Sequence, residues 1–255
     1  MLDDLMKNFW FEDVNSIDKR YTSNQYEGNK LIEYIRQFQN GNFQSKKEFR
    51  DYFLYSTDQQ IFVLGMRLFM TVADHKDFKL LEDFLGNCDE WQLRTFLTYV
   101  QESLSLHAIP YLLALFEDWE ETYAGKDIAR CICAMLGQRY YEEKEYNVEE
   151  LGTTFVEFTE KHDLSLFYYK GVEYFAGDLT KTLITVMMDC CKKGKAFYTD
   201  QIPSILSNSS GLKCPVSYGT IINQEKIIEV YGYAEAISKK NNERGKKYFY
   251  NYKIQ

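Results

Sequence analysis

The chain has 255 residues, a formal net charge of −8 and only 3 Pro. Few prolines favour long helical runs, because a proline inside a helix removes a backbone hydrogen bond and clashes with the preceding turn. No stretch reaches 18 uninterrupted apolar residues, and no basic segment precedes an apolar run at the start. The sequence therefore predicts neither a membrane span nor a secretory signal.

Apolar residues recur at helical spacing along most of the chain, which predicts helices. An apolar and aromatic opening, Leu2 to Phe11, is expected to dock on the body of the protein. Start and stop signals then bound the predicted helices, which cover residues 29–39, 45–54, 57–72, 77–85, 89–103, 107–121, 124–136 and 149–162.

The last ninety residues change in character. Helices are predicted over 179–191 and 224–241. Between them, residues 203–218 are rich in Ser, Asn, Gly and Pro, which predicts a loop with one short helical turn. The alternating aromatic tail at 246–253 is predicted to be a short strand or an ordered extension.

Two consecutive helix pairs align at an offset of about 31 residues, apolar on apolar: Phe62 with Leu93, Leu81 with Leu112, Phe84 with Leu115, and Leu85 with Phe116. Repeated helix pairs are typical of solenoids, in which each unit covers the open face of its neighbour. The predicted fold is therefore all-α. A HEAT- or armadillo-like helical-repeat array (α-solenoid) occupies residues 1–163, and residues 164–255 are a helical region that continues or caps it.

Charge is unevenly distributed along the chain. Residues 74–163 carry 20 acidic and 8 basic side chains, a net charge of −12, whereas residues 164–255 carry 8 and 13, a net charge of +5. A field of this kind repels nucleic acid and attracts basic proteins. The middle of the chain is therefore expected to bind a basic protein surface.

The sequence offers no arrangement of residues typical of catalysis or metal binding. Glycine-rich nucleotide motifs and the G-x-S-x-G elbow are absent, and the histidines (His75, His107 and His162) have no carboxylate or Cys at metal-ligand spacing. The six cysteines include no C-x-x-C pair, and Cys131 and Cys133 lie inside an apolar helix as expected buried hydrophobes. We predict no catalytic residue, metal or cofactor, and a reducing cytoplasmic location.

Two acidic and aromatic clusters are the candidate partner-binding residues. Tyr and Trp are favoured anchors at protein interfaces, and carboxylates around them complement a basic patch and speed association. The alternative is that the Trp packs between repeats while the carboxylates only solvate the surface. The candidates are Glu117, Asp118, Trp119, Glu120 and Glu121 in the first cluster and Glu142, Glu143 and Glu145 in the second, beside Tyr140, Tyr141 and Tyr146.

Several stretches together resemble the helical immunity proteins of bacterial polymorphic toxin systems, specifically the immunity protein 47 family. The resemblance covers roughly Met1 to Thr122. The stretches that carry it are Leu5–Phe11, Arg67–Phe69 with Val72–Asp77, and Glu102–Leu106 running into Pro110–Glu120.

This resemblance implies a cytoplasmic, non-enzymatic protein that binds one cognate toxin tightly and blocks it by occlusion. An acidic inhibitor suits a nuclease toxin, whose substrate cleft must be basic, because carboxylates can occupy the places of phosphates. The leading hypothesis is thus an immunity protein that neutralises a toxin with a basic binding surface, without nucleic acid or membrane as a partner.

Two other functions are considered. The first is a non-catalytic helical-repeat adaptor for protein–protein interaction in another bacterial complex, which would present a similar surface. The second is an enzyme, such as a HEAT-like DNA repair protein. That enzyme would need a basic concave face with a carboxylate aimed into it, and the acidic middle of the chain argues against both.

Overall fold

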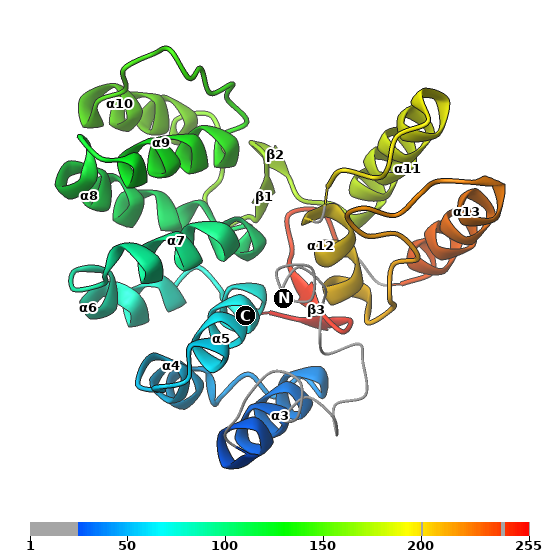
Figure 1. Ribbon diagram of the computed structural model, residues 1–255, viewed down its shortest axis with the longest axis horizontal. Helices are drawn as coiled ribbons and strands as arrows, with labels where there is room; N and C mark the ends of the chain where they lie inside the picture. The colour runs from blue at the N-terminus through cyan, green and yellow to red at the C-terminus, as the bar shows by residue number, and fades with distance from the viewer. Residues whose placement is uncertain (1–24, 200, 241–242, 255) are drawn as a thin grey trace. The chain divides into compact units, whose positions relative to one another are not determined.

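The computed structural model describes residues 25–199, 201–240 and 243–254 (Figure 1). This part of the chain is mostly helical, with two short β-hairpins, which confirms the predicted predominance of helix. None of its helices is both long and apolar enough to cross a bilayer. The predicted docking of Leu2–Phe11 lies outside the described residues.

Contacts group the described chain into two compact units. The central unit comprises Lys46–Ser56 and Gly65–Tyr174. The terminal unit comprises the described residues up to Ser45, together with Thr57–Leu64 and Phe175–Ile254. The predicted division into a helical-repeat region, 1–163, and a region 164–255 that continues or caps it stays a prediction.

The central unit is built from short helices at nearly all the predicted places. Three of the predicted helices are divided. Residues 77–85 form a 3-10 helix followed by a single α-turn, residues 89–103 end in a 3-10 turn, and residues 107–121 begin in one. The elements are α4 (Lys46–Leu54), α5 (Gln59–Val72, from Gly65 onward), η3 (Asp77–Leu81), α6 (Glu82–Leu85), α7 (Glu90–Tyr99), η4 (Val100–Ser103), η5 (Leu106–Ala108), α8 (Ile109–Trp119), α9 (Tyr123–Met135) and α10 (Val148–Thr159).

Capping side chains fix where these helices begin. The Asp89 carboxylate accepts the Gln92 N–H at 2.8 Å, and the Gln92 side chain accepts the Asp89 N–H at 3.0 Å. Two of the N–H groups that the start of α7 leaves without an intrahelical partner are thereby satisfied. Thr122 and Asn147 cap α9 and α10 in the same way. Each cap contributes about 1 kcal/mol to helix stability.

Packing between neighbouring helices holds the central unit together. Helix α7 packs against α9, while α8 packs against α6, α9 and α10. The aligned apolar positions Leu81, Leu112, Leu85 and Phe116 are all buried. Phe84, aligned with the buried Leu115, is only half-buried, and the helical repeat itself stays a prediction.

Buried polar side chains about 31 residues apart in the sequence also hydrogen-bond to one another. Lys46 donates to Asp77, 31 residues later, and to Asp74 at 3.0 Å. Thr71 donates to Glu102, again 31 residues later, at 3.2 Å. Because these groups are largely removed from water, breaking one partner would leave an uncompensated charge in the interior.

A β-hairpin that the sequence analysis missed closes the central unit. It pairs β1 (Tyr168–Tyr169) with β2 (Val172–Glu173) through a turn in which Lys170 and Gly171 have positive φ. The Gly171 N–H donates to the Met135 carbonyl at 2.9 Å, near the C-terminus of α9. The hairpin therefore satisfies a carbonyl that the helix end leaves without an intrahelical partner.

The terminal unit contains four helices and a second hairpin. Helix α12 packs against α11 and against the hairpin, and α11 also packs against α13. The elements are α3 (Gln25–Gln39), α11 (Ala176–Lys193), α12 (Gln201–Ser210), α13 (Gln224–Ser238), β3 (Tyr248–Phe249) and β4 (Tyr252–Lys253).

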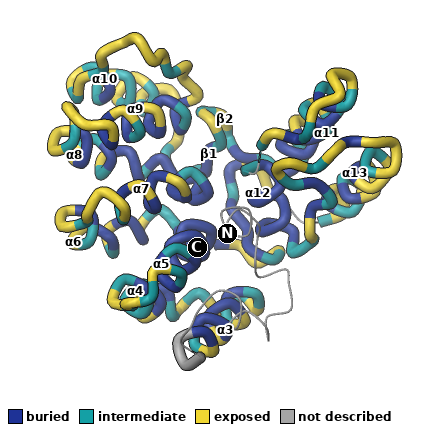
Figure 2. Tube along the Cα trace, viewed as in Figure 1, coloured by how far each residue is buried: buried dark blue, intermediate teal, exposed yellow. Residues whose placement is uncertain are grey.

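Helix α12 corrects the prediction of a loop over 203–218. Nine of its residues, from Ile202 to Ser210, are buried, and Figure 2 shows the helix dark blue along its length. Small polar side chains make this possible: the Ser210 hydroxyl donates to the Leu206 carbonyl at 2.7 Å, and the Ser207 hydroxyl accepts the Cys214 N–H. Serines that bond the backbone in this way can be buried at little cost, whereas the buried Ser209 hydroxyl has no hydrogen-bond partner among the described residues.

The second hairpin confirms the predicted strand in the tail and repeats the arrangement of the first. It pairs Tyr248–Phe249 with Tyr252–Lys253 through another positive-φ turn. The Asn251 N–H donates to the Ser209 carbonyl at 2.9 Å, two residues before Gly211. In the first hairpin the Gly171 N–H likewise donates to the Met135 carbonyl, two residues before Gly137. In each unit, therefore, a hairpin turn packs on the end of a helix that is followed by a glycine.

Candidate functional site: an acidic hollow

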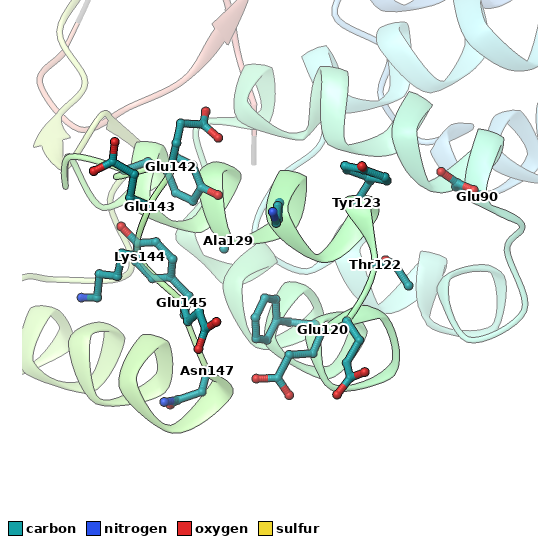
Figure 3. A pocket seen from close by; sticks show the side chains of 15 residues that line it. Glu90, Glu120, Thr122, Tyr123, Ala129, Glu142, Glu143, Lys144, Glu145 and Asn147 are labelled. Atoms are coloured by element: carbon teal, nitrogen blue, oxygen red, sulfur yellow. The ribbon is translucent and has the colours of Figure 1, made fainter.

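A hollow of about 940 Å³ opens on the central unit where α8 ends, α9 begins and the loop 138–147 returns to α10 (Figure 3). Its lining includes six glutamates and two lysines. The lining residues are Glu90, Phe116, Glu120, Glu121, Thr122, Tyr123, Lys126, Ala129, Tyr140, Glu142, Glu143, Lys144, Glu145, Tyr146 and Asn147.

A tight turn between α8 and α9 sets one wall of the hollow. The Thr122 hydroxyl donates to the Trp119 carbonyl at 2.7 Å and accepts the Gly125 N–H at 3.2 Å. A Cβ at Gly125 would lie 2.3 Å from the Trp119 oxygen, so only glycine permits this approach of the two helices. The turn leaves Glu120 and Glu121 exposed beside the hollow.

The loop 138–147 forms the opposite wall and is held in place by its own side chains. The rings of Tyr140 and Tyr146 stack with centroids 5.1 Å apart, and the Tyr141 N–H donates to the Tyr146 hydroxyl at 3.0 Å. Lys144 pairs with Glu150 at the start of α10. The loop therefore presents its carboxylates from a defined conformation.

Arg130 and Lys144 compensate part of the negative charge on and beside this loop. Arg130 pairs with Glu142 at 2.9 Å and lies 5.1 Å from the centroid of the Tyr140 ring. Burial opposes the charged guanidinium, but the hydrogen bond and charge of Glu142 raise the pKa of Arg130. The hydrogen bond to Glu150 similarly raises the pKa of Lys144, which lies 4.8 Å from the centroid of the Tyr146 ring.

Four carboxylates of the hollow have no salt bridge within the described chain: Glu120, Glu121, Glu143 and Glu145. All four are exposed, and Figure 3 shows Glu143 and Glu145 on the loop and Glu120 across from them. Uncompensated charges of one sign around a concave surface produce a negative potential there.

The structure brings together five of the eight predicted partner-binding residues at this hollow: Glu120, Glu121, Glu142, Glu143 and Glu145. Glu117 and Asp118 are exposed but do not line it, and neither does the half-buried Trp119. Their role in partner binding stays a prediction.

The hollow also contains residues that the sequence analysis did not select. Tyr140 and Tyr146 stood beside the second cluster and could have been chosen as its aromatic component. Glu90 and the exposed Tyr123 come from the starts of α7 and α9. No sequence pattern connects these helix starts, because only the packing of α7 against α9 brings them near one another.

The histidines have structural partners in the central unit. The rings of His75 and His107 lie 4.7 Å apart, and their Nε2 atoms are within 3.2 Å of the Ser165 and Leu164 carbonyls, respectively. His162 stacks on Phe158 with ring centroids 3.8 Å apart. Within the described ranges, no group of three His, Cys, Asp or Glu side chains is placed to hold a metal ion.

The cysteines of α9 lie in the core, as the sequence analysis expected. Cys131 and Cys133 are both buried. Burial raises the pKa of the Cys131 thiol to about 12, which keeps it protonated at neutral pH. Such a thiol is a packing residue rather than a nucleophile.

Comparison with known proteins identifies the family. The family model described as Immunity protein 47 matches residues 6–254, nearly the whole sequence. The chain belongs to this family. The match extends well beyond the stretches that carry the resemblance and includes both units. No curated protein and no solved structure matches the chain.

Proposed function

We propose that this Immunity protein 47 family member neutralises a cognate bacterial toxin in the cytoplasm by binding it without catalysis. The observation that carries the proposal is the meeting of two acidic segments at one hollow. Glu120 and Glu121 follow α8, whereas Glu143 and Glu145 lie on the loop before α10. Packing thus converts two separate clusters into one acidic surface.

The toxin surface that fits this hollow is basic. Unpaired carboxylates attract a partner's Lys and Arg, and the exposed Tyr123, which lines the hollow, supplies aromatic contact area. A nuclease has a basic substrate cleft, since it must bind phosphates. Occlusion of such a cleft by the acidic hollow would block access of nucleic acid.

We also propose that the central unit is a HEAT-like array. In such an array of helix pairs, first helices pack on first helices and second helices on second helices. The packing of α7 on α9, and of α8 on α6 and α10, is what this proposal requires, and α9 packs in addition against α8 and α10. In this arrangement the hollow lies at one end of the array, beside the long loop that connects α9 to α10.

The test is charge reversal at the hollow. The variant Glu120→Lys, Glu121→Lys, Glu143→Lys and Glu145→Lys is co-expressed with the toxin domain encoded next to this chain. We expect survival to be lost, and association in vitro to slow at least tenfold at low salt because electrostatic steering is removed. The matched control reverses four other exposed carboxylates, Glu33, Asp83, Glu157 and Glu160.

Each result has a definite meaning. Protection by the control but not by the hollow variant supports the proposal. Equal protection by both variants would exclude the hollow as the contact surface. Failure of the unaltered chain to protect against this toxin would reject immunity to it and favour the adaptor function.

A further inference from the structure

The helix α13 of the terminal unit carries apolar side chains on two faces. Its inward face buries Val230, Tyr233 and Ile237. Its outward face exposes Ile228, which is 72% exposed, and Tyr231, one turn later. A helix that only covers a core usually has a polar outer face, and this outward pair departs from that pattern.

A short antiparallel pairing precedes this helix and is also apolar on its outside. Ala196 pairs with Ile221, and the Phe197 N–H donates to the Thr220 carbonyl at 2.9 Å. Because successive side chains alternate between faces, Phe197 is buried while Tyr198 is exposed on the same side as Ile221. Ile221 is 70% exposed.

These two elements are directly connected. Asn223 caps α13 through the Lys226 N–H at 2.9 Å, only two residues after Ile221. We call the exposed apolar residues of the pairing, of the turn that precedes its second strand and of the helix the α13 surface: Tyr198, Tyr218, Ile221, Ile228 and Tyr231. Single exposed apolar residues are ordinary, but several on adjoining elements mark an interaction surface.

Two lysines lie at the Tyr198 end of the α13 surface, whereas α13 itself carries exposed glutamates such as Glu225. Lys195 directly precedes the pairing, and Lys192 lies in the last turn of α11; both are exposed without a salt bridge among the described residues. Lys193 hydrogen-bonds Asp189, and the Tyr198 hydroxyl is near enough to contribute to the raised pKa of that lysine. The exposed tyrosine therefore lies near the basic end of α11.

We propose that the α13 surface is a second contact surface for the toxin, and that it binds an apolar patch flanked by carboxylates. This inference rests on the proposed function. The family match includes the terminal unit through residue 254, so this unit belongs to the domain that defines the family. The chemistry of the surface is complementary to an apolar, acidic surface and differs from that of the hollow.

Binding kinetics separate the two surfaces. The probe is the catalytically inactivated toxin domain encoded next to this chain, immobilised for biolayer interferometry against the full chain. The variant Ile228→Ala with Tyr231→Ala should raise the dissociation rate at least tenfold, because buried apolar anchors mainly set residence time. The pair Lys192→Glu and Lys195→Glu should slow association severalfold at low salt.

The matched control is Tyr55→Ala, which removes a tyrosine that is 83% exposed on the central unit and should leave both rates within twofold. Dissociation rates of the Ile228 and Tyr231 variant within twofold of the unaltered chain would overturn this inference and leave the proposed function intact. Failure of the unaltered chain to bind would overturn both. A dimer in sedimentation that the Ile228 and Tyr231 variant abolishes would instead assign the surface to a second copy of this chain.

Discussion

Gly137 lies directly against the backbone of Lys170. A Cβ at Gly137 would be 2.4 Å from the Lys170 carbonyl oxygen, and Gly137 itself has a φ of +70°. This glycine ends α9, and the turn of the first hairpin rests on it. The end of the helix and the hairpin turn therefore depend on each other for their conformation.

Replacement of this glycine should destabilise the central unit strongly. Gly137→Ala would combine a left-handed backbone conformation with a clash against a backbone atom that cannot rotate away. We expect a loss of about 3 kcal/mol in the free energy of unfolding, measured by urea denaturation.

Gly194 provides the control for this prediction. It ends α11 with a φ of +60°, but a Cβ there would meet no atom within 4 Å. Gly194→Ala should therefore cost only the backbone preference, about 1 kcal/mol. Equal losses for the two variants would show that the hairpin moves aside without cost.

The helical part of the fold was predictable from sequence because apolar periodicity and caps act locally. The helix predicted from Asp89 does begin there, with Asp89 as its cap, and apolar positions such as Leu112 are buried as the periodicity predicts. Helix α12 was not predictable in this way. Its serines favour turns locally, and only the surrounding helix α11 and hairpin make the helical form of this segment stable.

The candidate site could be predicted only in part for the same reason. Local composition identified the clusters at Glu120 and Glu143, but not that they share one hollow. Their meeting depends on the turn at Gly125 and on the stacked loop tyrosines, which are tertiary features. Residues contributed by a distant helix start, such as Glu90, have no signal in their own neighbourhood.

The buried lysine of α4 should be important for stability. Lys46 is the cation between Asp74 and Asp77, and all three side chains are nearly removed from solvent. Lys46→Met would leave two carboxylates without their counter-charge. We expect the free energy of unfolding to fall by about 3 kcal/mol in urea denaturation.

An exposed ion pair provides the comparison. Lys239→Met removes the partner of Glu235, where both side chains are largely in water, and should not shift the unfolding midpoint measurably. If Lys46→Met also left the unfolding midpoint unchanged, Asp74 and Asp77 would have to become protonated or hydrated once the lysine is removed.

The same cluster predicts a loss of stability in acid. Burial alone would raise the pKa of Asp74, but the charge and hydrogen bond of Lys46, with two backbone N–H donors, lower it below 3.8. The folded state thus holds this proton less tightly than the unfolded state does. The stabilisation is complete above about pH 4 and is lost as the pH falls through the folded pKa.

Unfolding midpoints at several pH values test this prediction. The unaltered chain should be more stable than Asp74→Asn at neutral pH, and the difference should shrink below about pH 4. A difference that stays constant to pH 3 would assign the loss to packing rather than to ionisation of this carboxylate.

The loop of the acidic hollow should depend on one hydroxyl group. The Tyr146 hydroxyl accepts the Tyr141 N–H at 3.0 Å, so Tyr146→Phe leaves that donor unpaired while keeping the ring stack with Tyr140. Since the loop is exposed, the free energy of unfolding should change by about 1 kcal/mol or less. Hydrogen exchange at the Tyr141 amide should accelerate at least tenfold.

A looser loop should also weaken toxin binding, because the complex must then pay for ordering the carboxylates of Glu143 and Glu145. Tyr140→Phe is the matched control: it keeps the stacked ring and its contact with Arg130 but leaves the Tyr141 donor paired. Weaker binding by Tyr146→Phe alone would connect the order of this loop to recognition. Faster exchange at Tyr141 with unchanged affinity would show that the toxin does not need a preformed hollow.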